Sequence, residues 1–168
     1  MKRTVCLLCA VLCLLLLGCV PQKGDYFAPF QGEFTARIRG EWQAIAFEAE
    51  LAASAPNGEG ERRMTLTFYA PGTLCGTVLT REESGALSLA HGELSLPLSA
   101  TAAAGYGALF DLFPVFGEVR AVSRENGNTR LDGVGFSLLF SADGIPLAAE
   151  NATARVQIEH FERQARRD

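Results

Sequence analysis

Two histidines and five cysteines are the residues of this chain whose chemistry could serve catalysis or metal binding. His91 and His160 lie far apart in the sequence, and neither has a partner at the spacing of metal ligands. Cys75 is the one cysteine beyond residue 19, and no histidine lies near it in the sequence. We expect a buried, inert thiol in a strand-like run. These residues therefore predict no enzyme, no metal site and no cofactor.

The other four cysteines belong to a hydrophobic N-terminal segment. Lys2 and Arg3 precede an apolar run from Val5 to Leu17, which is shorter than the roughly 20 residues that a membrane-spanning helix needs. This arrangement is typical of a secretory signal. The segment ends in Leu16-Leu17-Gly18-Cys19, which resembles the bacterial lipobox. The resemblance implies cleavage by signal peptidase II before Cys19 and acylation of that cysteine.

The lipobox sets the expected organisation of the chain. It implies a signal peptide over residues 1–18, a tether over 19–29, one β-rich domain over 30–162 and a polar tail over 163–168. The protein would be lipid-anchored on the extracytoplasmic side of a bacterial cell membrane or outer membrane. Two or three acyl chains on one cysteine anchor stably, whereas one chain attaches reversibly. An ordinary cleaved signal peptide and an uncleaved anchor are the alternatives.

Charge and cysteine content narrow the possible partners. The net charge of −4 is scattered along the chain, which argues against nucleic acid and against a basic, lipid-hugging surface. The short basic cluster Arg163–Arg167 is interpreted as a solvated tail. With Cys75 as the one cysteine of the folded part, no intrachain disulfide is available. The oligomeric state is left open.

Alternation of apolar and polar residues runs through most of the chain. Phe34, Ala36 and Ile38 alternate with polar residues, and the same period of two recurs in later segments, at residues 47–51, 64–69, 87–98, 119–121, 134–140 and 156–158. Strict alternation predicts antiparallel strands with one covered face. Asn126-Gly127 is the strongest hairpin signal. We expect a meander of about nine strands.

One segment departs from this period. Ser99 is a candidate N-cap for a helix from Thr101 to Phe113, and Pro114 would end it. Its apolar side chains share one face, while Gly105 and Gly107 weaken it by roughly 1 kcal/mol each. We expect this helix to pack on the apolar side of the sheet. It would be either the other half of the core or a movable lid over a cavity.

Taken together, the lipobox, the meander and the inserted apolar helix resemble the LolA-like superfamily of lipoprotein carriers and lipid-binding lipoproteins. Residues 64–71 (MTLTFYAP) are similar to a strand-then-proline segment of these proteins. Residues 141–146 (SADGIP), followed by Arg155 to Phe161, are similar to their D-x-G-x-P turn and closing strand. The resemblance implies an α+β, mainly β fold: a curved antiparallel sheet, or unclosed barrel, with one apolar helix packed on its concave face.

The superfamily uses this fold to sequester acyl chains, so the resemblance implies non-covalent binding of a lipid or an acylated partner. The candidate cavity positions are Phe34, Ile38, Phe47, Met64, Phe68, Leu109, Phe110, Phe113, Phe136 and Phe140. A structural or protein-interaction lipoprotein with a filled core is the alternative. Two family features lack an identified counterpart: a helix before the first strand, and the basic residues that hold the lid of the carriers shut.

Overall fold

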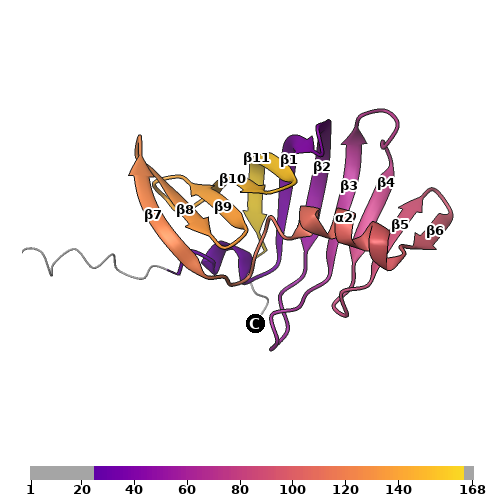
Figure 1. Cartoon of the computed structure of the whole chain (residues 1–168), viewed down its shortest axis with the longest axis horizontal. Coiled ribbons are helices and arrows are strands. Elements are labelled where there is room, and N and C mark those ends of the chain that lie inside the picture. Colours follow the sequence, from indigo (N-terminus) through magenta and orange to yellow (C-terminus); the bar gives the residue numbers. More distant parts are fainter. Residues whose placement is uncertain (1–24, 165–168) are drawn as a thin grey trace, which may run out of the picture.

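One antiparallel sheet of eleven strands organises residues 25–164, the part of the chain that this computed structural model describes (Figure 1). Its spatial order is β6-β5-β4-β3-β2-β1-β11-β10-β9-β8-β7. Two meanders, β1 to β6 and β7 to β11, are therefore joined where the first strand pairs with the last. Because β6 and β7 lie at opposite edges, the chain between them has to cross the sheet, and the helix α2 belongs to this crossover.

The strands and helices have the following bounds. A short 3-10 helix, η1, precedes the sheet, and α2 is the one α-helix among the described residues. In chain order the elements are η1 Ala28–Phe30, β1 Phe34–Trp42, β2 Ile45–Ala53, β3 Met64–Ala70, β4 Thr77–Arg81, β5 Leu87–His91, β6 Leu94–Pro97, α2 Ala100–Phe110, β7 Val119–Glu125, β8 Asn128–Gly133, β9 Phe136–Phe140, β10 Pro146–Asn151 and β11 Ala154–Arg163.

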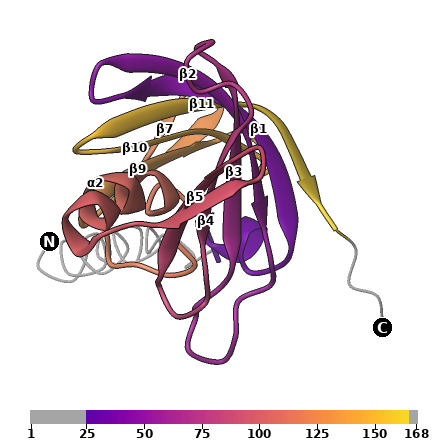
Figure 2. The ribbon, with the colours of Figure 1, turned by 90° about the vertical axis from the view of Figure 1, so that its right-hand side faces the viewer.

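The sheet curves around α2, which lies in its concavity (Figure 2). This confirms the predicted fold, an unclosed antiparallel sheet with an apolar helix on the concave face. No helix within residues 25–164 is long and apolar enough to cross a bilayer. The signal peptide, Cys19 and the first part of the expected tether lie outside the described residues.

The period of two is clearest in the central strands. In β1 and β3 the buried side chains, Phe34, Ala36 and Ile38 in the one and Met64, Leu66 and Phe68 in the other, all lie on the concave side. In β11 a bulge opposite Arg37 and Ile38 shifts the register, so that the side chain of His160 is exposed and 2.8 Å from the Glu162 carboxylate. Continuing the alternation of Val156 and Ile158 to His160 predicts an inward side chain, and this prediction is wrong, because one extra residue reverses the parity.

Two predicted boundaries differ from the observed ones. Residues 128–140, which the Asn126-Gly127 hairpin signal would make one strand, form two, because Gly135, at a φ of 82°, turns the chain between β8 and β9. The Asn126-Gly127 hairpin is confirmed, with both residues at positive φ. At β6 the leucines of the alternating pattern, Leu94 and Leu96, are exposed, since this edge strand extends past the cover that α2 provides.

The helix starts at Ala100, one residue before the expected Thr101, and ends earlier than expected. The Ser99 hydroxyl accepts a hydrogen bond from the Ala102 amide, as expected of an N-cap. The helix stops at Phe110, three residues before the expected end. The residue before a proline is disfavoured in helical conformation, and here Asp111 caps the helix while Leu112 and Phe113 turn into the core.

Gly40 in β1 offers a test of how closely the two meanders approach each other. A Cβ at this position would lie 2.0 Å from the backbone carbonyl oxygen of Arg155 in β11. We expect Gly40→Ala to lower the free energy of unfolding by about 2 kcal/mol or more, because backbone has to move to admit it. Gly58→Ala is the control, because a Cβ added at this loop position would have no atom beyond its chain neighbours within 4 Å. Chemical denaturation measures both, and equal effects would contradict the close approach.

Candidate functional site

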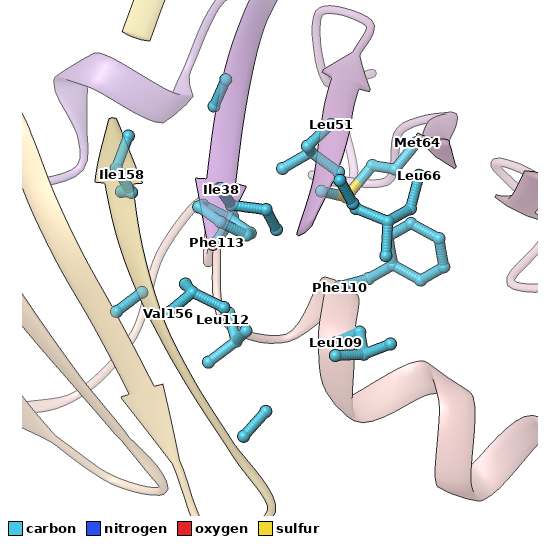
Figure 3. Packing of buried hydrophobic residues seen from close by; sticks show 14 of the residues in the cluster. Ile38, Leu51, Met64, Leu66, Leu109, Phe110, Leu112, Phe113, Val156 and Ile158 are labelled. Atoms are coloured by element: carbon cyan, nitrogen blue, oxygen red, sulfur yellow. The ribbon is translucent and has the colours of Figure 1, made fainter. Parts of the chain in front are cut away.

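The concave face is closed to solvent in this structure. Nine of the ten candidate cavity residues are at most 3% exposed, Phe136 being the half-buried exception. Figure 3 shows how Leu109, Phe110, Leu112 and Phe113 at the end of the crossover point toward sheet residues that include Ile38, Leu66 and Val156. The crossover therefore covers the apolar face with its own side chains.

A buried cation lies at the centre of this closure. Arg62, two residues before the start of β3, is 3% exposed. Its guanidinium donates to two backbone carbonyl oxygens, Phe30 O at 2.6 Å and Phe113 O at 2.5 Å. The same group lies over the ring of Phe34, 5.0 Å from the centroid. Arg62 thus connects η1, the segment after α2 and the start of β3.

The surroundings of Arg62 do not neutralise its charge. Among the described residues, no carboxylate lies within salt-bridge distance of it, and its Nε atom has no acceptor. Burial lowers the pKa of Arg62 to about 10, with a further contribution from the positive charge of Arg81. The side chain stays charged at neutral pH. Because its pKa is lower in the folded than in the unfolded state, burying the charge costs stability throughout the neutral range.

Arg81 in β4 forms the second polar connection to the crossover. Its Nη1 is 2.9 Å from Oδ1 of Asp111, the C-cap of α2, and its guanidinium lies over the ring of Phe110. Its Nη2 contacts the sulfur of Met64 at 3.2 Å. On the other side of the helix, the Asn151 amide donates to Ala108 O at 2.6 Å. Polar groups of the sheet therefore hold the last turn of α2 from two directions.

A pocket of about 330 Å³ opens between three loops at this end of the helix. Phe110 and Phe113, which also belong to the hydrophobic core, line the pocket. Arg62 and Arg81 add positive charge to the lining. The other lining residues come from the β2–β3 loop, the β4–β5 turn and the segment after α2: Gly60, Glu61, Glu82, Glu83, Gly85, Asp111, Pro114, Val115 and Phe116. The volume is at the lower end of the range of ligand sites.

The pocket can bind a ligand, but its described lining residues include no histidine, cysteine, serine or threonine that could act as a catalytic base or nucleophile. Within residues 25–164, no cluster of three or more His, Cys, Asp or Glu side chains could hold a metal ion. Cys75 is exposed, contrary to the expected burial, because it lies in the turn before β4 rather than in a strand. His91 pairs with the hydroxyl of Thr77 across β4 and β5, at 3.2 Å.

The structure brings most of the candidate cavity residues into one cluster. Phe110 and Phe113 line the pocket, while the other buried residues pack beneath α2 and the segment that follows it. Phe136 lies apart from the pocket, with its ring against Gly133, Gly117 and Phe27.

Sequence reasoning missed Arg62, although a signal was present. The alternation of β3, extended back by two residues, places Arg62 on the same face as Met64, Leu66 and Phe68. A basic residue at an apolar position of such a run indicates a buried charge with a structural or binding role.

Comparisons with solved structures agree with this fold. A conserved protein of unknown function from Thermus thermophilus is similar to this chain, at 14% identity and a TM-score of 0.51, over 83% of each chain. A domain assigned to the outer membrane lipoprotein-sorting proteins, from Vibrio parahaemolyticus, has 11% identity and a TM-score of 0.47, over 87% of this chain and 94% of its own. A LolA superfamily protein from Nitrosomonas europaea has 9% identity and a TM-score of 0.41, over 80% and 87%.

These likenesses concern the fold. The unclosed antiparallel sheet with one helix, which the resemblance to LolA-like proteins implies, is present in the structure itself. No family model matches the chain, and no curated protein matches it.

Arg62 and its neighbour Arg63 form a matched pair for testing the closure. We expect Arg62→Ala to lower the free energy of unfolding by about 2 to 4 kcal/mol, because two buried carbonyl oxygens lose their donor. Arg63→Ala breaks only an exposed pair with Glu82 and should change stability by less than about 1 kcal/mol. Denaturant titration followed by tryptophan fluorescence gives both values. Similar losses in the two variants would show that the carbonyl contacts are unimportant.

Proposed function

We propose that this protein is a membrane-anchored extracytoplasmic lipoprotein that binds a lipid or an acylated partner non-covalently. The observation that carries the proposal is the pocket beside Arg62. Two aromatic residues that line this pocket, Phe110 and Phe113, also pack between the crossover and the concave face. A ligand that enters there meets apolar surface that continues beneath α2. Burial of apolar area at about 25 cal/mol per Å² supplies the driving force, and no catalytic group is required.

The polar groups of the pocket favour an amphiphilic ligand. Phe110, Phe113 and Phe116 give the pocket apolar surface, and the partly exposed guanidinium of Arg81, which lies over the ring of Phe110, can meet a polar headgroup. Carboxylates from Glu82, Glu83 and Asp111 also line the pocket, and they disfavour a ligand with several negative charges. The proposed ligand therefore combines an acyl chain with a small polar end.

A structural or protein-interaction lipoprotein is the second candidate function. It is favoured by the near-complete burial of the side chains on the concave face, which leaves them in contact with one another in this structure. In that case the exposed surface would carry the activity, and the pocket would stay free of lipid.

Anchoring is tested at Cys19. We expect the full-length protein to float with membranes in a density gradient and the Cys19→Ser variant to be released, because acyl chains on one cysteine provide stable attachment. Cys75→Ser, which alters the exposed thiol in the turn before β4, is the control and should float like the unmodified protein. If Cys19→Ser stayed membrane-bound, the proposed anchor would be wrong.

Ligand binding is tested on the Cys19→Ser protein, which brings no acyl chains of its own. We expect saturable binding of a fluorescent fatty acid and co-purified lipid in mass spectra of solvent extracts. Glu83→Trp, which places a large ring at the pocket, should weaken binding severalfold, whereas Glu93→Trp in the exposed turn after β5 should leave it unchanged.

The same measurements separate the two candidate functions. Absence of both extracted lipid and fatty-acid binding would favour the structural or protein-interaction lipoprotein. Binding that is equally strong in the Glu83 and Glu93 variants would place the ligand away from this pocket.

A further inference from the structure

Three apolar side chains are exposed close together where the segment after α2 enters β7. Phe116 is 69% exposed, Val134 47% and Val119 36%. Phe116 and Val119 are three residues apart, and the Val134 amide donates to the carbonyl of Glu118, at 3.1 Å. We call these three residues the tether-side patch.

The backbone under this patch is held in place from inside. The Phe136 ring lies close to two glycines. A Cβ added at Gly133 would come within 2.2 Å of this ring, and one added at Gly117 within 2.7 Å. Phe116 rests on Gly60 of the β2–β3 loop in the same way. The two glycines of the β7 and β8 ends thus let one aromatic ring fill the interior, while Val119 and Val134 stay on the outside. The exposed patch is a built feature rather than a frayed end.

The patch lies next to the point where the described chain begins. The ring of Phe27 packs edge-on against Phe136, with centroids 6.0 Å apart, and Phe27 also approaches Gly117. In Figure 1 the start of β7 lies beside the indigo segment that contains η1. Cys19 precedes Asp25 by six residues, which span about 22 Å at most when fully extended.

From this placement we propose that the tether-side patch docks on the bilayer surface, with the membrane as its occupant. The inference rests on the proposed anchoring through Cys19, because the short tether then keeps the patch within reach of the lipid headgroups. A tethered surface experiences a high effective concentration of its partner, so three side chains suffice for a contact that would be weak in free solution. Acyl chains and the patch together form two signals for one membrane.

The chemistry of the patch fits an uncharged lipid interface. Phenylalanine and valine gain from leaving water, and the nearest exposed charges along the chain, Glu118 and Arg120, have opposite signs. Docking in this orientation turns the pocket toward the membrane, because Phe116 belongs both to the patch and to the pocket lining. A lipid would then pass from the bilayer to the pocket across Phe116.

The test uses the full-length, anchored protein in phosphatidylcholine vesicles. In a Cys75→Ser background, an environment-sensitive dye is attached to Val134→Cys or, as control, to Leu94→Cys. Leu94 is also exposed and apolar, and it lies on β6 at the opposite edge of the sheet. We expect a blue shift at position 134 and quenching by spin-labelled lipid, with neither at position 94. Adding Val119→Asp should abolish both at position 134, whereas Ser123→Asp further along β7 should not.

The outcomes distinguish docking from anchoring. A protein that floats with vesicles but shows no difference between the dyes at positions 134 and 94 overturns docking and leaves the anchor intact. A protein that does not float overturns the anchor, and the inference fails with it. A blue shift that grows with protein density but is not quenched by spin-labelled lipid identifies a second copy of the chain as the occupant and overturns the proposal.

Discussion

Strands β6 and β7 lie at opposite edges of one sheet, so the chain between them has to cross the apolar face, and the rest of the structure depends on that crossing. An apolar helix makes the crossing without leaving backbone groups unpaired, because its own hydrogen bonds satisfy most of them. The ends of the crossover need external partners. Ser99 caps its start, and Arg81, Asn151 and Arg62 meet its end.

Arg62 both stabilises and destabilises the folded state. Its burial without a carboxylate partner disfavours folding, as its lowered pKa indicates, yet its two carbonyl bonds hold the start of the domain and the end of the crossover against β3. A hydrophobic residue there would avoid the cost of a buried charge but would leave both carbonyl oxygens without a donor. The region of the fold that depends on this one cation is also the region where the pocket opens.

The pocket, the exposed Phe116 and the start of the described chain lie near one another. Phe116 connects the pocket to the patch beside β7, and Phe27 connects that patch to the start of the described chain. In the proposed docked orientation the pocket would face the anchoring membrane, which would suit exchange of lipid or binding of an acylated partner close to a bilayer. The same geometry would orient an interaction surface if the concave face stays filled.

Local sequence determined most of the strands and turns and the start of the helix, because alternation, the Asn126-Gly127 pair and the Ser99 cap act over a few residues. It indicated about nine strands, whereas the described residues form eleven, and β4 and β10 lie outside the alternating runs. It also indicated nine of the buried candidate residues, six of them in strands through alternation and Leu109, Phe110 and Phe113 through the apolar face of the expected helix. Only the tertiary structure decided the bulge that turns His160 outward and the β1–β2 turn, where Gln43 and Ala44 adopt positive φ without glycine. It alone gave Arg62 its partners, since the carbonyls of Phe30 and Phe113 come from segments 32 and 51 residues away. Contacts of that range depend on how a curved sheet brings its two meanders together, which no local pattern encodes.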